Sequence, residues 1–192
     1  MQQGLLEQAA DEILVHRYVE TGNREAFELL VRRYTRPLRR LLYTLLGGGS
    51  IEDMEDAEQE IFTELFLHLA SFRFQSSFKT YFYRLARNRA IDFLRRRRTR
   101  KTRQDLLHTR LRLEPDRPPG PEESLLAREA GDRLVSALLG LKEEERMLIV
   151  MKDSEGMAVC EIASVLGVPE GTVKSRLHRA RARLVRQLQE KA

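Results

Sequence analysis

The chain of 192 residues has a single cysteine and no long apolar run. One cysteine excludes a disulfide framework and a zinc site built from cysteines, and it fits a reducing cytoplasm. We expect Cys160 to be a small buried hydrophobic side chain on the apolar side of its helix. No stretch approaches the roughly 20 apolar residues that span a bilayer, and residues 1–12 lack the pattern of a secretory signal. The sequence therefore predicts a cytoplasmic protein without membrane insertion.

The alternating pattern of β-strands is also missing, whereas apolar residues recur three to four positions apart across much of residues 26–69. This spacing predicts helices. Residues 114–121, which read EPDRPPGP, follow a basic stretch and fit neither a helix nor a strand. The predicted fold class is therefore all-α, with two small helical domains at residues 1–94 and 121–192. A flexible basic linker at residues 95–120 would join them.

Acidic residues are scarce in two segments of the chain. Residues 1–94 hold 12 Lys and Arg against 14 Asp and Glu, whereas residues 95–120 hold 10 against 3. Residues 121–170 hold 5 basic against 11 acidic residues, and residues 171–192 hold 7 against 1. Charge segregated in this way indicates one surface for a polyanion and other surfaces for a different partner.

A ladder of carboxylates recurs at every fourth position, at Asp56, Glu60 and Glu64. A helical metal site would need a histidine three residues after a glutamate and a second helix with the same pattern. His68 instead follows Glu64 by four residues, and no second helix matches. We therefore predict no metal and no cofactor, and interpret the ladder as a solvated helix start or a surface for a basic partner.

Six of the 13 aromatic residues lie within residues 72–83. Residues 72–79 resemble a loop, and the helix expected after it carries a polar stripe. The stripe consists of Tyr81, Arg84, Asn88, Asp92 and Arg95. These groups suit single-stranded nucleic acid. Unpaired bases stack on rings and bond to amides, while the phosphate backbone meets arginine. Core packing would account for at least half of the aromatic side chains, which leaves Tyr81 and the loop residues as candidates for contact.

Residues 161–184, EIASVLGVPEGTVKSRLHRARARL, predict two helices joined by a tight turn. Gly167 suits a left-handed helix end, and the second helix has an apolar stripe and an opposite basic face. This arrangement is a helix-turn-helix, whose second helix enters the major groove of DNA. An ordinary basic surface helix is the alternative.

Three blocks in this order resemble bacterial RNA polymerase sigma factors of the sigma-70 family, in the extracytoplasmic-function group. The blocks are DAEQEIF at 56–62, SFKTYFYRLARNRAIDFLR at 77–95, and the helix-turn-helix at 161–184. The resemblance implies that residues 1–94 form sigma region 2 and residues 121–192 form sigma region 4. It implies a non-enzymatic protein that binds core polymerase and directs promoter-specific initiation.

The resemblance also assigns site residues. It implies that the polymerase-binding residues are Asp56, Gln59, Glu60 and Phe62. Binding of the minus-ten element falls to Phe74, Gln75, Ser76, Lys79, Tyr81, Arg84, Asn88 and Asp92, with Tyr81 at a position where the family usually has tryptophan. Binding of the minus-35 element falls to Glu170, Gly171, Thr172, Lys174, Ser175, Arg176, His178, Arg179 and Arg183.

The implied partners are promoter DNA, an anti-sigma factor and core polymerase, through the clamp helices of its largest subunit and, for region 4, its flap. Two other classes of protein end in a helix-turn-helix. A site-specific recombinase would need an activated nucleophile, but Ser76 and Ser77 have no evident base. A stand-alone transcriptional regulator would not need an acidic ladder followed by an aromatic loop, and it remains the alternative.

Overall fold

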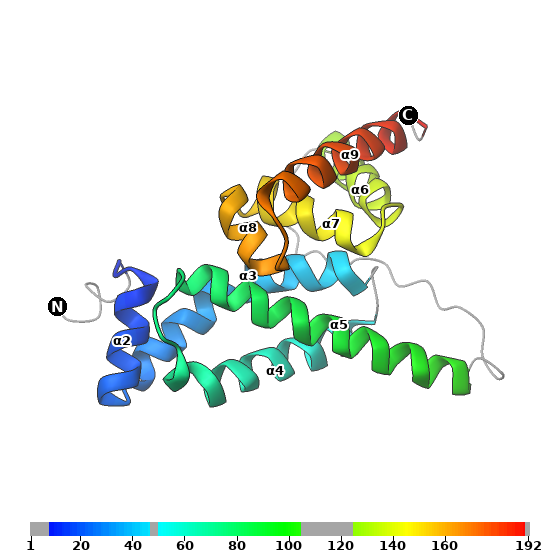
Figure 1. Ribbon diagram of the computed structural model, residues 1–192. Helices are drawn as coiled ribbons and strands as arrows, with labels where there is room; N and C mark the ends of the chain where they lie inside the picture. The colour runs from blue at the N-terminus through cyan, green and yellow to red at the C-terminus, as the bar shows by residue number, and fades with distance from the viewer. Residues whose placement is uncertain (1–7, 47–49, 105–124, 191–192) are drawn as a thin grey trace.

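The computed structural model describes residues 8–46, 50–104 and 125–190, and within these ranges all regular structure is helical. The first bundle contains α2 (Asp11–Thr21), α3 (Arg24–Leu46), α4 (Ile51–His68), the 3-10 turn η1 (Leu69–Ser71) and α5 (Phe78–Gln104). The second contains α6 (Leu125–Leu139), α7 (Glu143–Ile149), the π-helical turn η2 (Val150–Ser154), α8 (Val159–Leu166) and α9 (Glu170–Gln189). The described elements are all helical, which confirms the predicted all-α class. Figure 1 shows one bundle stacked on the other.

The core of the first bundle forms where α3 meets α5. A stripe on α5 is fully buried at Phe78, Phe82, Ala86 and Ala90. The spacing of four residues places these side chains on one face of the helix. The ring of Tyr34 on α3 lies 5.2 Å from that of Phe78 and 4.5 Å from that of Phe82, measured between centroids. Each large side chain buried in this way stabilises the fold by about 1.5–3 kcal/mol.

Most of the aromatic concentration at residues 72–83 belongs to this core. The buried members are Phe72, Phe78, Phe82 and Tyr83. This confirms that at least half of these rings serve packing. Tyr81 is half-buried, and the side chain of Phe74 in the preceding loop is 44% exposed. Only these two rings therefore retain a surface for a ligand.

Two sequence expectations differ from the structure. Helix α5 continues to Gln104, so residues 95–104 of the expected linker are helical, in keeping with the good helix propensity of arginine and lysine. The rest of that linker, up to residue 120, lies outside the described residues. The prediction for Cys160 was wrong, because its side chain is exposed. Helix α8 buries Ile162, Ala163 and Val165, and Cys160 lies on the opposite face.

Polar contacts join the two bundles. Arg40 on α3 forms an ion pair with Glu155, with 2.6 Å between Nη2 and Oε1. The ammonium of Lys79 donates to the backbone oxygen of Glu155 at 2.5 Å, and the hydroxyl of Ser77 donates to the Glu161 carboxylate on α8 at 3.2 Å. The start of α5 and the middle of α3 therefore form the surface on which the second bundle rests.

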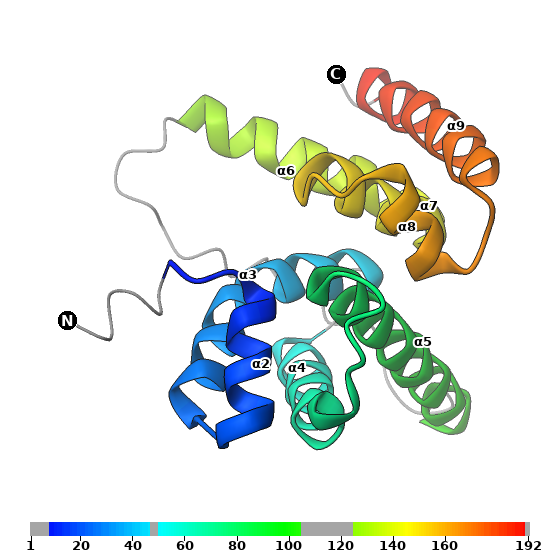
Figure 2. The same cartoon turned by 60° about the vertical axis from the view of Figure 1, so that its left-hand side comes forward.

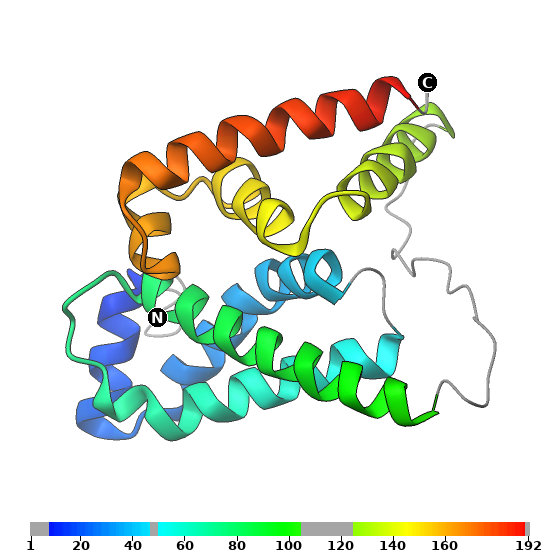
Figure 3. The same ribbon diagram turned by 45° about the vertical axis from the view of Figure 1, so that its right-hand side comes forward.

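A buried arginine makes a further link. Arg146 on α7 is 6% exposed and donates to the backbone oxygens of Leu139 at 3.0 Å and of Leu45, at the end of α3, at 3.4 Å. Burial lowers the pKa of Arg146 from its ordinary value, yet these carbonyl groups partly replace water around the charge. Helices α7 and α8 lie between α9 and the first bundle, so α9 lies on the far side (Figure 3).

The ion pair of Arg40 can be tested by reversing its charge. Arg40→Glu would place a second carboxylate against Glu155, whose side chain is only 7% exposed. The pair itself contributes about 1 kcal/mol or less, since Arg40 is partly solvated, and reversal adds repulsion. We expect a larger radius of gyration in small-angle X-ray scattering, restored by adding Glu155→Arg. Arg39→Glu is the matched control, because Arg39 pairs with Glu58 inside the first bundle. An unchanged radius in Arg40→Glu would contradict this role.

Candidate functional site

The turn between α8 and α9 has the geometry expected of a helix-turn-helix. Gly167 ends α8 with φ +67°, and its N–H donates to the backbone oxygen of Ala163 at 2.8 Å. No atom lies within 4 Å of a Cβ added at this glycine, so the backbone angle and not space favours glycine here. Val173 and Leu177 on α9 are buried, which seats this helix on α7 and α8. The rest of α9 is left to face outward.

The outward face of α9 contains most of the residues that the sequence assigned to duplex DNA. The exposed members are Glu170, Gly171, Lys174, Ser175, His178, Arg179 and Arg183, whereas Thr172 and Arg176 are half-buried. They begin at the amino end of the helix, which is the end that a helix-turn-helix presents to base edges. The structure therefore brings these residues together on one helix surface.

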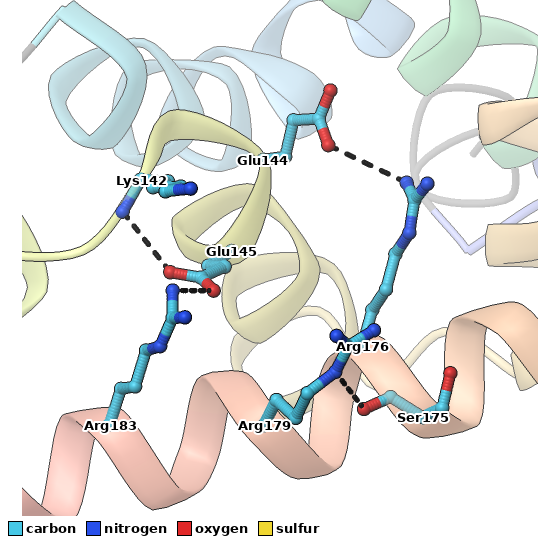
Figure 4. A network of polar contacts seen from close by, with 7 residues as sticks. All are labelled: Lys142, Glu144, Glu145, Ser175, Arg176, Arg179 and Arg183. Carbon is cyan, nitrogen blue, oxygen red and sulfur yellow. Dashed lines mark hydrogen bonds and ion pairs between the residues drawn. The ribbon is translucent and has the colours of Figure 1, made fainter.

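Three arginines of α9 form ion pairs with carboxylates that lie on other elements of the same bundle. Arg176 pairs with Glu144 at 3.5 Å, and Arg183 pairs with Glu145 at 2.5 Å (Figure 4). Arg181 pairs with Asp153, and this hydrogen-bonded contact raises the pKa of Arg181 above its ordinary value. These arginines are thus partly neutralised before any polyanion arrives.

Arg179 differs from these three arginines. Its Nε donates to the backbone oxygen of Ser175 at 3.3 Å, and no ion pair of Arg179 occurs in the part of the chain that the structure describes. A cleft of about 640 Å³ separates α9 from the start of α7, with Arg179 on one wall and Glu144 on the other. The sequence analysis missed Glu144 and Glu145. The signal was the run of glutamates at 143–145, which is also what the positive end of a helix dipole favours.

The polar stripe of α5 faces solvent at Arg84, Asn88 and Asp92. Arg87 donates to Oδ1 of Asn88 at 3.2 Å, which leaves the amide NH₂ of Asn88 available as a donor. Tyr81 packs against Phe72 with 4.9 Å between ring centroids, and burial raises the pKa of Tyr81. The stripe therefore presents charged and amide groups beside a ring that is only partly accessible.

The loop before α5 holds the other residues assigned to the minus-ten element. Phe74 and Gln75 are exposed and Ser76 is half-buried. Phe74 has φ +53°, which is unusual for a bulky residue. Lys79 points away from this loop surface, because its ammonium donates to the backbone oxygen of Glu155 in the second bundle. The loop and stripe lie together, but Lys79 lies between the bundles.

On α4 the acidic ladder is only partly free. Asp56 and Gln59 are exposed, whereas Glu60 pairs with Arg96 and Glu64 pairs with Arg89 on α5. Phe62 is half-buried, with its ring 6.0 Å from that of Phe82. In the part of the chain that the structure describes, His, Cys, Asp and Glu side chains do not gather into a group that could hold a metal ion, and every helix is too short or too polar to span a bilayer. The amino-terminal half of α4, where Asp56 is exposed, therefore presents an acidic surface.

Comparisons with known proteins match both bundles. The family described as Sigma-70 region 2 matches residues 30–100, and Sigma-70, region 4 matches residues 131–184. The ECF RNA polymerase sigma-E factor of Haemophilus influenzae is 32% identical to this chain, and the alignment covers 96% of this chain and 98% of that protein. The ECF RNA polymerase sigma-E factor of Escherichia coli K12 is 34% identical, and the alignment covers 91% of this chain and 92% of that protein. The structure of CnrH in complex with the cytosolic domain of CnrY aligns with a TM-score of 0.70 at 27% identity, over 96% of this chain and 100% of that one.

The carboxylates opposite α9 give a testable electrostatic effect. The double variant Glu144→Gln with Glu145→Gln frees Arg176 and Arg183, while the amide oxygen introduced at position 145 can still accept from the N–H of Lys142. We expect affinity for duplex DNA of any sequence to rise about tenfold at low salt, with the salt slope steeper by about one to two units. Fluorescence anisotropy at several salt concentrations measures both.

The matched control is Glu20→Gln with Glu28→Gln, which changes the net charge equally at exposed sites on α2 and α3. If the double variant at Glu144 and Glu145 bound duplex DNA more weakly than the control, the carboxylates would be orienting the arginines rather than neutralising them.

Proposed function

The chain belongs to the extracytoplasmic-function group of the sigma-70 family, whose members direct RNA polymerase to promoters and are not enzymes, and we propose that its two bundles divide this task. Residues 1–94 bind core polymerase and the minus-ten element, and residues 121–192 bind the minus-35 element. Residues 95–120 connect them. A stand-alone regulator would not require the region 2 match, which covers residues 30–100.

The amino-terminal half of α9 reads the minus-35 element. The observation that carries this assignment is the exposure of Lys174, Ser175, His178 and Arg179. These residues belong to α9, the helix that lies on the far side of the second bundle from the first (Figure 3). Arg179 is the base-reading arginine, because the guanidinium groups of Arg176 and Arg183 are shared with carboxylates. Those two arginines hold phosphates, which position the helix without reading sequence.

The loop with Phe74, Gln75 and Ser76 and the stripe with Arg84, Asn88 and Asp92 bind the melted minus-ten strand. An exposed ring suits stacking on an unpaired base, and the free NH₂ group of Asn88 suits a base edge. Tyr81 contributes mainly by packing, since it is half-buried against Phe72. Lys79 reaches DNA only when the contact with Glu155 is exchanged, so the bundles separate when the promoter is bound.

The acidic surface of α4 binds the clamp helices of the largest polymerase subunit. Asp56 and Gln59 provide exposed acidic and amide groups, Glu60 shares its carboxylate with Arg96, and Phe62 adds a half-buried ring. The flap of polymerase contacts the second bundle. We also propose that an anti-sigma factor restrains this chain in the cytoplasm, and its relative CnrH is in complex with the cytosolic domain of CnrY.

Charge reversal on α4 tests the polymerase contact. Asp56→Lys should weaken binding to core polymerase by about tenfold or more, since a reversed charge at an interface costs about 2 kcal/mol or more. The fold should survive, because Asp56 is exposed. Co-elution with core polymerase measures binding, and circular dichroism checks the fold. Glu28→Lys, an equal charge change at an exposed site on α3, should bind as the wild type does. Full core binding by folded Asp56→Lys would exclude this surface.

Substitution of one arginine tests the reading of the minus-35 element. Arg179→Ala should cost about 1–3 kcal/mol at the preferred promoter and relax the preference at one or two base pairs. Arg183→Ala should weaken all sequences alike. In vitro transcription from a promoter library with reconstituted polymerase measures both effects. If Arg179→Ala selected the wild-type minus-35 sequence, α9 would bind DNA there without reading it through Arg179.

A further inference from the structure

No residue of α2 is among those proposed to contact polymerase or DNA, and the region 2 match begins after this helix, at residue 30. The helix is nevertheless firmly placed. Leu14 and Val15 are fully buried, and the Asp11 carboxylate accepts from Arg33 at 2.7 Å and from the hydroxyl of Tyr34 at 2.5 Å. These contacts fix the first two turns of α2 on α3. Figure 2 shows that α2 lies beside the segment that connects α4 to α5, and it contacts both η1 and α5.

The first contact from α2 to this segment is at the start of α5. Oε1 of Glu12 accepts the backbone N–H of Phe78 at 2.9 Å. Phe78 is the first residue of α5, so its N–H has no partner within the helix. Ser77, which precedes the helix, accepts the N–H of Thr80 at 3.2 Å, whereas Glu12 accepts that of Phe78. A carboxylate from another helix therefore caps α5 and fixes the point where the loop ends.

The second contact is with the exposed ring of the loop. The ring of His16 packs on that of Phe74, with 5.9 Å between centroids, and Phe72 packs on Phe74 at 4.8 Å. Nδ1 of His16 lies 2.9 Å from a carboxylate oxygen of Glu20, which orients the imidazole. Phe74 is thus held in place although its side chain is 44% exposed and its φ is +53°. A bulky residue keeps such a backbone angle only where its surroundings impose it.

We propose that α2 positions the loop that binds the minus-ten strand, with Glu12 holding the backbone at Phe78 and His16 holding the ring of Phe74. The inference rests on the minus-ten role proposed above for this loop. Both residues act as positioning residues, since they set where Phe74 and Gln75 meet an unstacked base. Base preference at the position facing the loop then depends on two side chains that precede the matched family region.

The test uses reconstituted holoenzyme and single-stranded oligonucleotides. The oligonucleotides carry the minus-ten sequence selected by the wild-type holoenzyme and each single-base change of it. Glu12→Ala and His16→Ala should each reduce discrimination at one base position by about tenfold, as expected for loss of one ordered stacking or loop contact. Glu12→Gln, which keeps a side-chain acceptor, and His16→Phe, which keeps a ring, should retain most of the wild-type preference.

Two controls separate positioning from general damage. Arg17→Ala changes an exposed residue on the same helix and should discriminate as the wild type does. Affinity for duplex minus-35 DNA, which depends on α9, should be unchanged in every variant. Wild-type preference in both alanine variants would overturn the inference alone, as would equal loss in Glu12→Gln and Glu12→Ala. Absence of any base preference in the wild-type holoenzyme would overturn the minus-ten assignment and the inference together.

Discussion

The position of Tyr34 is the constraint on which most of the first bundle depends. Its ring lies against Phe78 and Phe82 of α5, and its hydroxyl donates to Asp11 of α2. Burial, and then the nearby Asp11 carboxylate, raise the pKa of Tyr34 far above its ordinary value, so the phenol remains a donor. One side chain of α3 therefore fixes two other helices. The loop before α5 and the surface under α8 take their positions from the same turns of α5.

Ion pairing decides which of the many basic residues can meet a polyanion. The formal net charge of the chain is only +5, and carboxylates bind many of its arginines. Arg96 is held by Glu60 and Arg183 by Glu145, whereas Arg179 has no such partner among the described residues. Charge that is already paired contributes less to binding any phosphate backbone. Specificity then depends more on the few groups that remain exposed.

The same first turn of α5 serves two surfaces. Ser77 and Lys79 bond to Glu161 and to the backbone of Glu155 in the second bundle, while the neighbouring loop faces solvent. The contact with Glu155 holds the ammonium of Lys79 between the two bundles. Contact between the bundles and access to Lys79 are therefore linked, and a partner that favours one state disfavours the other.

Local patterns predicted the features that depend on neighbouring residues. Apolar spacing predicted the helices, Gly167 predicted the left-handed turn, and the dense rings at residues 72–83 predicted a largely buried cluster. Contacts between distant residues were out of reach: Arg183 and Glu145 are 38 residues apart, and Phe78 and Glu12 are 66 apart. A helical pattern shows which residues share a face, but only the packing of other helices decides what that face meets. For this reason the exposed face of α9 could be predicted, whereas the pairing of its arginines and the contacts of α2 with the loop and α5 came from the tertiary structure.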